Sequence, residues 1–116
     1  MVMPKVELYP SDVYARFFQG LANPTRLQII EALLDGEKNV TQLVSLLGTS
    51  QSQVSNQLSC LRWCGYVRSH QQGRHTFYRI ADPRIRDIIS LARQVVGDNA
   101  QNLLVCTRLA SEDEGG

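Results

Sequence analysis

The chain has 116 residues, of which 43% are hydrophobic, and a formal net charge of +1. This composition suits one small globular domain and argues against a disordered chain. No apolar run approaches the roughly 20 residues that span a bilayer, and the N-terminal MVMPKVELYP lacks the apolar core and cleavage site of a secretory signal. We therefore expect a cytoplasmic protein without a membrane partner, in which the three cysteines stay reduced.

The net charge conceals an uneven distribution along the chain. No Asp or Glu occurs between residues 38 and 81, and all 11 acidic residues lie outside this stretch. The basic residues within it are Lys38, Arg62, Arg68, Arg74 and Arg79, together with His70 and His75. Such segregation creates a local positive potential in a nearly neutral protein, so it favours a polyanion-binding face over a merely solvated one.

Two helices are predicted in the first third of the chain. Val13 and Phe17 belong to an apolar row at helical spacing that defines the first helix. The second helix has Asn23 as its natural N-cap, Pro24 in its first turn and Gly36 as its end. The residues expected to form its buried stripe are Leu27, Ile30 and Leu34, widened by Ile29 and Leu33.

A helix-turn-helix pattern follows. A third helix fits NVTQLVSLLG, and only a short turn after Gly48 separates it from a fourth helix in SQSQVSNQLSCLRWCG. The residues of the third helix expected to face inward are Leu43, Leu46 and Leu47. Next, YVRSHQQ and RHTFYRI flank Gly73, and both segments are rich in strand-forming residues. This pattern predicts a β-hairpin that forms the wing of a winged helix.

Asp82 and Pro83 start a last long helix with a wide apolar stripe. A stripe of this width in so small a domain indicates a dimer seam, with packing onto the chain's own core as the alternative. The residues predicted to form the dimer seam, two of them in the first helix, are Val13, Phe17, Ile88, Ile89, Ala92, Val95 and Val96.

The predicted fold is therefore mostly α-helical, with four helices, a small β-hairpin and a fifth helix in a homodimeric winged helix-turn-helix. The predicted parts are an N-terminal arm at 1–11, the DNA-binding and dimerisation domain at 12–97, a C-terminal arm at 98–110 and a disordered tail at 111–116.

The fourth helix has the polarity expected of a DNA-recognition helix. With Val54 at zero on a helical wheel, Leu58 and Leu61 fall within about 40° of it and form a narrow core stripe. The polar residues at the start of this helix, predicted to contact DNA, are Ser50, Gln51, Ser52, Gln53, Ser55 and Asn56. They offer hydrogen bonds to base edges without repelling phosphates. We expect Arg74 and His75 at the hairpin tip to meet phosphate or a minor groove.

Three stretches, LANPTRLQIIEALL, TSQSQVSNQLSCLR and GRHTFYRIAD, strongly resemble the ArsR/SmtB family of bacterial winged-helix repressors. The resemblance runs from about residue 14 to residue 96. It implies a homodimer that binds double-stranded operator DNA until an inducer, often a metal ion, lowers its affinity. An enzyme is not expected, because the chain has no carboxylate pair, nucleophile–base motif or glycine-rich phosphate loop.

Two metal sites known in the family are missing from this sequence. The third helix begins in EKNVTQL, without the Cys-x-Cys pair of arsenic and cadmium sensors, and the last helix lacks the His of zinc sensors. Cys60 and Cys64 at the end of the fourth helix, with Cys106 in the C-terminal arm, instead resemble the cadmium/lead sensors called CmtR-type. The resemblance thus implies a metal site at Cys60, Cys64 and Cys106, within one subunit or across the dimer.

The spacing of the first two cysteines also carries a physical argument. Cβ atoms four residues apart on a helix are about 5–6 Å apart, whereas a disulfide needs about 3.8 Å. A metal that bonds each sulfur at about 2.3 Å can bridge them without strain. A helix C-terminus also resists thiolate formation in the absence of a metal. Three thiolates suit the soft ions Cd(II), Pb(II), Hg(II) and As(III), with Zn(II) as a further candidate.

The sequence therefore predicts a transcriptional repressor released from operator DNA by a soft metal ion, with Cd(II) or Pb(II) implied by the resemblance. Two alternatives remain open at this point. The repressor could sense oxidants or reactive sulfur through its thiols, or the cysteines could be small buried residues of a reduced protein.

Overall fold

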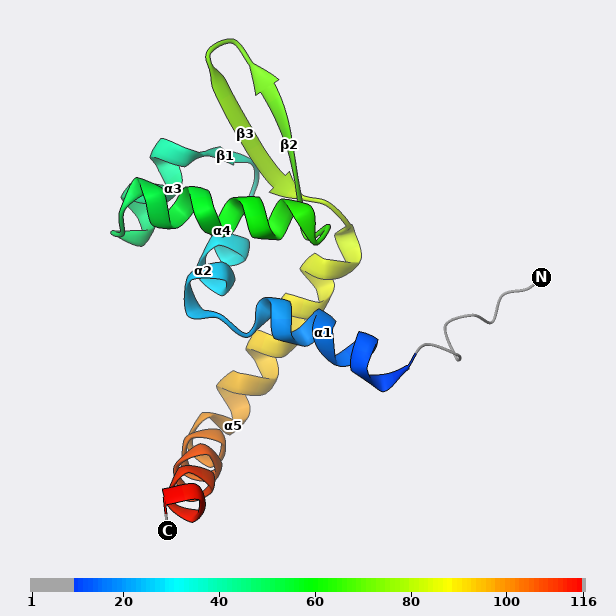
Figure 1. Cartoon of the computed structure of the whole chain (residues 1–116), viewed down its shortest axis with the longest axis vertical. Helices are drawn as coiled ribbons and strands as arrows, with labels where there is room; N and C mark the ends of the chain where they lie inside the picture. Colours follow the sequence, from blue (N-terminus) through cyan, green and yellow to red (C-terminus); the bar gives the residue numbers. More distant parts are fainter. Residues whose placement is uncertain (1–9, 116) are drawn as a thin grey trace, which may run out of the picture. The chain divides into compact units, whose positions relative to one another are not determined.

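The computed structural model describes the backbone of residues 10–115 and the side chains of residues 10–105. The elements in chain order are α1 (Ser11–Leu21), α2 (Pro24–Ala32), β1 (Lys38–Asn39), α3 (Val40–Leu47), α4 (Gln51–Trp63), β2 (Val67–Gln72), β3 (His75–Ile80) and α5 (Pro83–Gly115) (Figure 1). The chain divides after Asp82 into two units, which are described separately. The winged helix-turn-helix prediction is confirmed.

The start of α2 follows the sequence signal, but its end does not. The Asn23 side chain accepts a hydrogen bond from the Arg26 backbone N–H at 3.0 Å, as an N-cap should. The helix ends at Ala32, before Leu34, so the wheel position of Leu34 no longer applies. The residues that this segment buries completely are Ile29, Ile30 and Leu33, whereas Leu27 and Leu34 are half-buried. The predicted stripe is therefore confirmed for Ile30, Ile29 and Leu33 and wrong for Leu27 and Leu34.

The helix-turn-helix is formed by α3 and α4. A capping box between Asn39 and Gln42 starts α3, and Gly48 ends it in the left-handed conformation at a φ of 68°. Leu43 is fully buried, but Leu46 is 61% exposed, which corrects the prediction that it faces inward. Leu46 lies about 60° around the helix from Leu43, on an edge of the stripe that no neighbouring element covers.

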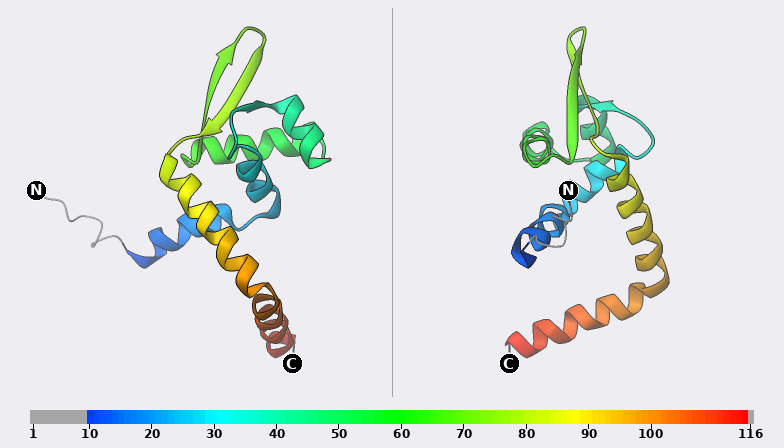
Figure 2. Two further views of the ribbon diagram at one scale, coloured as in Figure 1. Left: turned by 180° about the vertical axis from the view of Figure 1, so that it is seen from behind. Right: turned by 90° about the vertical axis from the view of Figure 1, so that its right-hand side faces the viewer.

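The hairpin has the predicted position and a partner strand that the sequence did not reveal. Strands β2 and β3 pair antiparallel from Val67 opposite Ile80 to Gln72 opposite His75. The two-residue strand β1 adds to the outer side of β3, which gives the sheet order β1-β3-β2. The hairpin projects away from α3 and α4 of the same unit (Figures 1 and 2).

The core of the first unit is apolar and contains the predicted stripe of α4. Its buried residues are Leu21, Ile29, Ile30, Leu33, Leu43, Val54, Leu58, Leu61, Tyr66, Val67 and Ile80. Within the described side chains, no polar or charged residue is buried. The core therefore fixes α4 by one face and leaves its other faces to solvent.

The second unit is helix α5, which begins at Pro83 as expected. It extends further than predicted, because the backbone remains helical to Gly115 and departs from helical geometry only at Asn99. The segment expected to form the C-terminal arm is thus helical beyond the departure at Asn99, and so are residues 111–115. In the described part of the chain, no helix combines the length and the apolar character needed to cross a bilayer.

Candidate functional site

The N-terminal part of α4 presents a row of exposed polar side chains. Ser50 is the N-cap, and its hydroxyl oxygen accepts a hydrogen bond from the Gln53 backbone N–H at 3.1 Å. Of the residues predicted to contact DNA, Ser50, Gln51, Ser52, Gln53 and Asn56 are exposed and Ser55 is half-buried. The side chains on the opposite face are fully buried, so this polar surface is held in place by the core.

The hairpin turn carries the second group of predicted contacts. Arg74 lies in the turn after Gly73, and both Arg74 and His75 are exposed. A hydrogen bond of 2.8 Å from the Thr76 hydroxyl to the Gln71 side chain ties the two strands together near the tip. The exposed Arg74 side chain is therefore held in a short turn between two paired strands.

The fold changes the charge pattern seen in the sequence. Although residues 38–81 contain no acid, Lys38 forms a salt bridge with Asp35 at 2.6 Å, and Glu37 lies 3.6 Å from His70. Both acids come from the connection before β1. The base of the hairpin is thus partly neutralised, whereas Arg74 at the tip lies in no described salt bridge.

Cys60 and Cys64 are both exposed free thiols at the C-terminal end of α4. Cys64 is the C-cap residue, and its backbone N–H donates to the Cys60 carbonyl at 3.0 Å, one helical turn away. Trp63 between them is 90% exposed. Both cysteines thus lie outside the core of the single chain, which contradicts the alternative that this pair consists of small buried residues.

The two thiols share a surface hollow. Its lining residues are Ser59, Cys60, Arg62, Trp63 and Cys64. Among the residues whose side chains are described, no cluster of three or more His, Cys, Asp or Glu could hold a metal. The side chain of Cys106 lies outside the described residues. The structure therefore describes the side chains of two of the three predicted ligands, both exposed, and their role as ligands stays a prediction.

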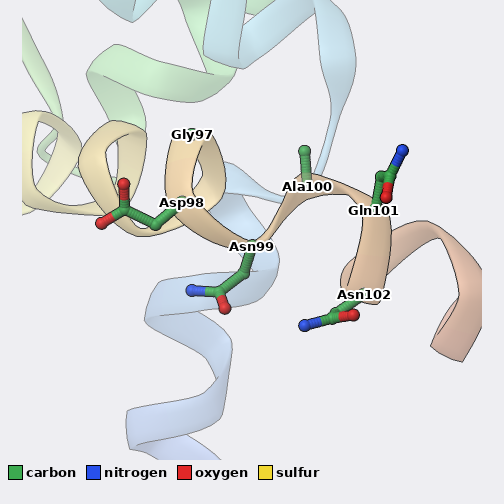
Figure 3. A pocket seen from close by; sticks show the side chains of 6 residues that line it. All are labelled: Gly97, Asp98, Asn99, Ala100, Gln101 and Asn102. Atoms are coloured by element: carbon green, nitrogen blue, oxygen red, sulfur yellow. The ribbon is translucent and has the colours of Figure 1, made fainter.

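The backbone bends within α5, seven residues before Cys106. At Asn99 the dihedral angles are −125° and 19°, and the Asn99 side-chain amide donates to the Val95 carbonyl at 3.1 Å. The hollow at the bend is lined by Gly97, Asp98, Asn99, Ala100, Gln101 and Asn102 (Figure 3). The Asn99 and Asn102 side chains point to the same side of the bend (Figure 3). The sequence did not predict this kink, which sets the direction of the segment that carries Cys106.

Comparison with known proteins shows where this arrangement belongs. Residues 23–69, which span α2, α3 and α4, match the family model described as bacterial regulatory protein, arsR family. A protein named "Probable mercury resistance operon repressor" from Streptomyces lividans is 45% identical over 103 residues, covering 89% of this chain and 82% of that protein. The chain belongs to the ArsR family.

Two further matches extend this assignment. The transcriptional regulator CmtR of Mycobacterium bovis is 42% identical over 98 residues, covering 84% of this chain and 83% of CmtR. The solution structure of a homodimeric winged helix-turn-helix DNA-binding domain from Mycobacterium bovis has a TM-score of 0.69 and 32% identity, with 87% of this chain and 91% of that domain covered. These relatives are named as regulators and not as enzymes.

The ArsR-family chain exposes apolar rows on α1 and on α5, each considered within its own unit. On α1, Val13 and Phe18 are about half exposed and Tyr14 is 61% exposed. The predicted seam residues on α5 divide: Ala92, Val95 and Val96 are exposed, Ile88 is half-buried, and Ile89 is only 4% exposed. Exposed apolar rows of this kind suit a second copy of the chain.

Tyr66, which the sequence analysis did not single out, lies two residues after Cys64. Its ring is buried, and its hydroxyl donates a short hydrogen bond to the Phe17 carbonyl of α1. Burial raises the pKa of the Tyr66 phenol, the nearby Cys64 raises it further, and Arg26 opposes them. This hydrogen bond joins residues 49 positions apart, so no local sequence pattern could have revealed it.

A second connection to α1 starts from the middle of α4. The Arg26 guanidinium donates to the Gln57 side-chain oxygen at 2.7 Å and to the Gly20 carbonyl at 3.3 Å. Arg26 thus lies between α4 and the last turn of α1, which receives hydrogen bonds from Arg26 and from Tyr66.

Proposed function

We propose that this ArsR-family protein is a transcriptional repressor that binds operator DNA as a homodimer and releases it when a soft metal ion binds three cysteines. The observation that carries this proposal is the arrangement of α4. One end of this helix presents the exposed polar residues suited to base edges, and the other end presents an exposed pair of free thiols. A ligand of the thiols therefore acts on the element that contacts DNA.

The thiol pair fits a soft metal ion. Both sulfurs are accessible in one hollow, and they are one helical turn apart on a rigid helix. A bound thiophilic ion supplies strong bonds to sulfur and takes the place of the thiol protons. Cys60 and Cys64 would hold it from α4, and Cys106 would approach as the third ligand. The Cd(II) or Pb(II) prediction follows CmtR-type sensors, and the name of the Streptomyces relative adds weight to Hg(II).

Release of the operator then depends on the position of the thiol ligands on α4. The polar start of α4 is fixed to the same helix as the two thiols, so a small rotation of this helix moves the residues that face the bases. In a dimer, half-site spacing depends on the relative orientation of the two such helices. A coupling of about 1–3 kcal/mol between metal and DNA binding lowers DNA affinity roughly 5- to 150-fold.

Metal titration of the full-length protein tests the ligand set. We expect thiolate-to-metal absorption with three sulfurs per ion, a weaker signal in Cys60→Ser, Cys64→Ser and Cys106→Ser, and an unchanged signal in Ser59→Ala, which alters the same hollow. Equal absorption from wild type and all three cysteine variants would contradict the proposed site.

The second candidate is thiol sensing without a metal, and the exposure of both thiols favours it. In that case an oxidised species, with Cys60 linked to Cys106, would release DNA in the absence of metal. Mass spectrometry of the protein eluted from an operator fragment after peroxide treatment separates the two functions, because the metal-dependent repressor is released with its thiols reduced.

A further inference from the structure

We propose that Tyr66 is a positioning residue that transmits the state of the thiol pair to helix α1, so that metal binding on α4 is felt at the apolar face of α1. This inference rests on the proposed function. It concerns how the thiol pair is coupled to the rest of the first unit and adds no metal ligand.

The path from the thiols to Tyr66 is short and fixed. Tyr66 follows Cys64 after Gly65, which has a φ of 88°, a conformation that favours glycine. The Tyr66 backbone N–H donates to the Leu61 carbonyl at 2.9 Å, and its carbonyl accepts from the Ala81 N–H at 3.0 Å. A displacement of Cys64 therefore reaches Tyr66 through a single intervening residue, and two backbone hydrogen bonds fix the Tyr66 backbone.

The Tyr66 side chain carries that displacement into α1. Its hydroxyl donates to the Phe17 carbonyl, and its ring packs against the Phe17 ring with centroids 5.5 Å apart. The ring also lies directly over Gly20. A Cβ atom at Gly20 would come within 2.8 and 2.9 Å of two ring carbons, and nearer still to the hydroxyl oxygen. The close approach of Tyr66 thus depends on the glycine in the last full turn of α1.

Arg26 gives α1 a second attachment, at the Gly20 carbonyl. It bonds the Gly20 carbonyl and the Gln57 side chain of α4. Tyr66 follows the C-terminal end of α4, whereas Gln57 lies within the helix. If the end of α4 tilts relative to its middle, Tyr66 and Arg26 are displaced by different amounts. Because both are hydrogen-bonded to α1, we expect α1 to rotate as well as to shift.

Helix α1 carries the exposed apolar row that suits contact with a second subunit. On α1, Val13, Tyr14 and Phe18 are 50%, 61% and 53% exposed. The rings of Tyr14 and Phe18 stack with their centroids 6.2 Å apart. This is the apolar row that suits a second copy of the chain. Reorienting it alters the relation between two subunits, on which the fit to two half-sites depends.

The test compares the full-length wild type with Tyr66→Phe and Gln57→Met. Tyr66→Phe removes only the hydroxyl, and Gln57→Met removes only the acceptor for Arg26. For each protein, operator affinity is measured without and with Cd(II), metal affinity is measured without DNA, and hydrogen exchange of the α1 amides is followed on addition of Cd(II). Tyr78→Phe, which removes a hydroxyl from a half-buried ring of β3, is the matched control.

We expect Tyr66→Phe to bind Cd(II) and metal-free operator within about threefold of wild type, while the Cd(II)-induced loss of operator affinity falls by at least about fivefold. The change in α1 hydrogen exchange on Cd(II) addition should disappear in the same variant. Gln57→Met should reduce the response in the same direction, and Tyr78→Phe should retain it in full.

Two outcomes separate this inference from the function on which it rests. If wild type and Tyr66→Phe release the operator to the same extent, the role of Tyr66 is refuted and the repressor proposal stands. If the wild type binds Cd(II) through its cysteines and keeps the operator, the proposed function fails and the coupling role fails with it. Loss of Cd(II) binding in Tyr66→Phe also refutes the role, because Tyr66 would then support the metal site itself.

Discussion

At the scale of single residues, the exposed side chains of α4 differ between its two ends. The first turns carry only Ser, Gln and Asn on the solvent side, and the last turn carries Cys60, Cys64 and Trp63. Amide side chains can form paired hydrogen bonds with adenine, whereas thiols bind bases poorly and soft metals well. The chemistry of each end therefore suits a different ligand.

Asn56 provides a test of base contacts by α4. Asn56→Ala should weaken operator binding by about 1–3 kcal/mol, because it removes a side chain able to bond a base edge. Fluorescence anisotropy at fixed salt should show little change for DNA of unrelated sequence, and Ser59→Ala should bind as wild type. Equal losses on operator and unrelated DNA would show that Asn56 contacts only the backbone.

The positions of the α4 side chains could be predicted from the sequence because a helical wheel needs only local spacing. The wheel placed Val54, Leu58 and Leu61 in the core, and the structure agrees. It failed for Leu46, whose exposure depends on which neighbours cover α3. It could not find the hydrogen bond of Tyr66 to α1, which depends on the folded chain.

At the scale of elements, the hairpin holds the Arg74 side chain at its exposed tip. The side-chain bond between Thr76 and Gln71 ties the two strands together near the tip, where Arg74 lies, and strand β1 pairs with β3 further from the tip. Strand β1 escaped prediction because two residues carry no detectable periodicity. It exists only through its pairing with Phe77 and Tyr78 of β3.

Arg74→Ala should weaken binding to operator and to unrelated DNA by similar factors. If Arg74 neutralises one phosphate, the slope of log affinity against log salt should decrease in magnitude by about 0.9. The slope is measured between low and moderate salt by anisotropy. Arg16→Ala, which removes the same charge from α1, should leave it unchanged, and an unchanged slope in Arg74→Ala would place the hairpin tip away from DNA.

The turn between α3 and α4 depends on a glycine, and a matched pair of substitutions tests it. Gly48→Ala should lower the free energy of unfolding by about 1–2 kcal/mol, since its φ of 68° strains any Cβ. Gly97→Ala, in a helix and with open space around its Cβ, should raise it by about 0.5–1 kcal/mol. Urea unfolding at one protein concentration measures both. A stable Gly48→Ala would refute the strain argument.

At the scale of the whole molecule, the proposed function requires two copies of the chain. The exposed apolar rows on α1 and α5 and the homodimeric neighbour support that arrangement. The sequence indicated the row on α5 through the width of its stripe. It placed Ile89 in the seam as well, but Ile89 is buried within the single chain, because a wheel cannot divide one stripe between a core and a partner.

Val95→Glu should weaken dimerisation at least about tenfold, or about 1.4 kcal/mol, because the seam would have to bury an unpaired carboxylate. Sedimentation equilibrium measures the dissociation constant. Gln94→Glu adds the same charge to a neighbouring polar position of α5 and should dimerise normally. An unchanged dimer in Val95→Glu would exclude this row from the seam.

In the proposed function, a metal bound to the thiol pair of α4 ends DNA binding. Metal titration of the protein bound to an operator fragment measures this release. Wild type, Cys60→Ser, Cys64→Ser and Cys106→Ser are bound to an operator fragment and titrated with Cd(II), Pb(II) and Hg(II). All four proteins should bind the fragment without metal, and only wild type should release it fully at stoichiometric metal. Release of the Cys60→Ser and Cys64→Ser variants at the wild-type metal concentration would contradict the account.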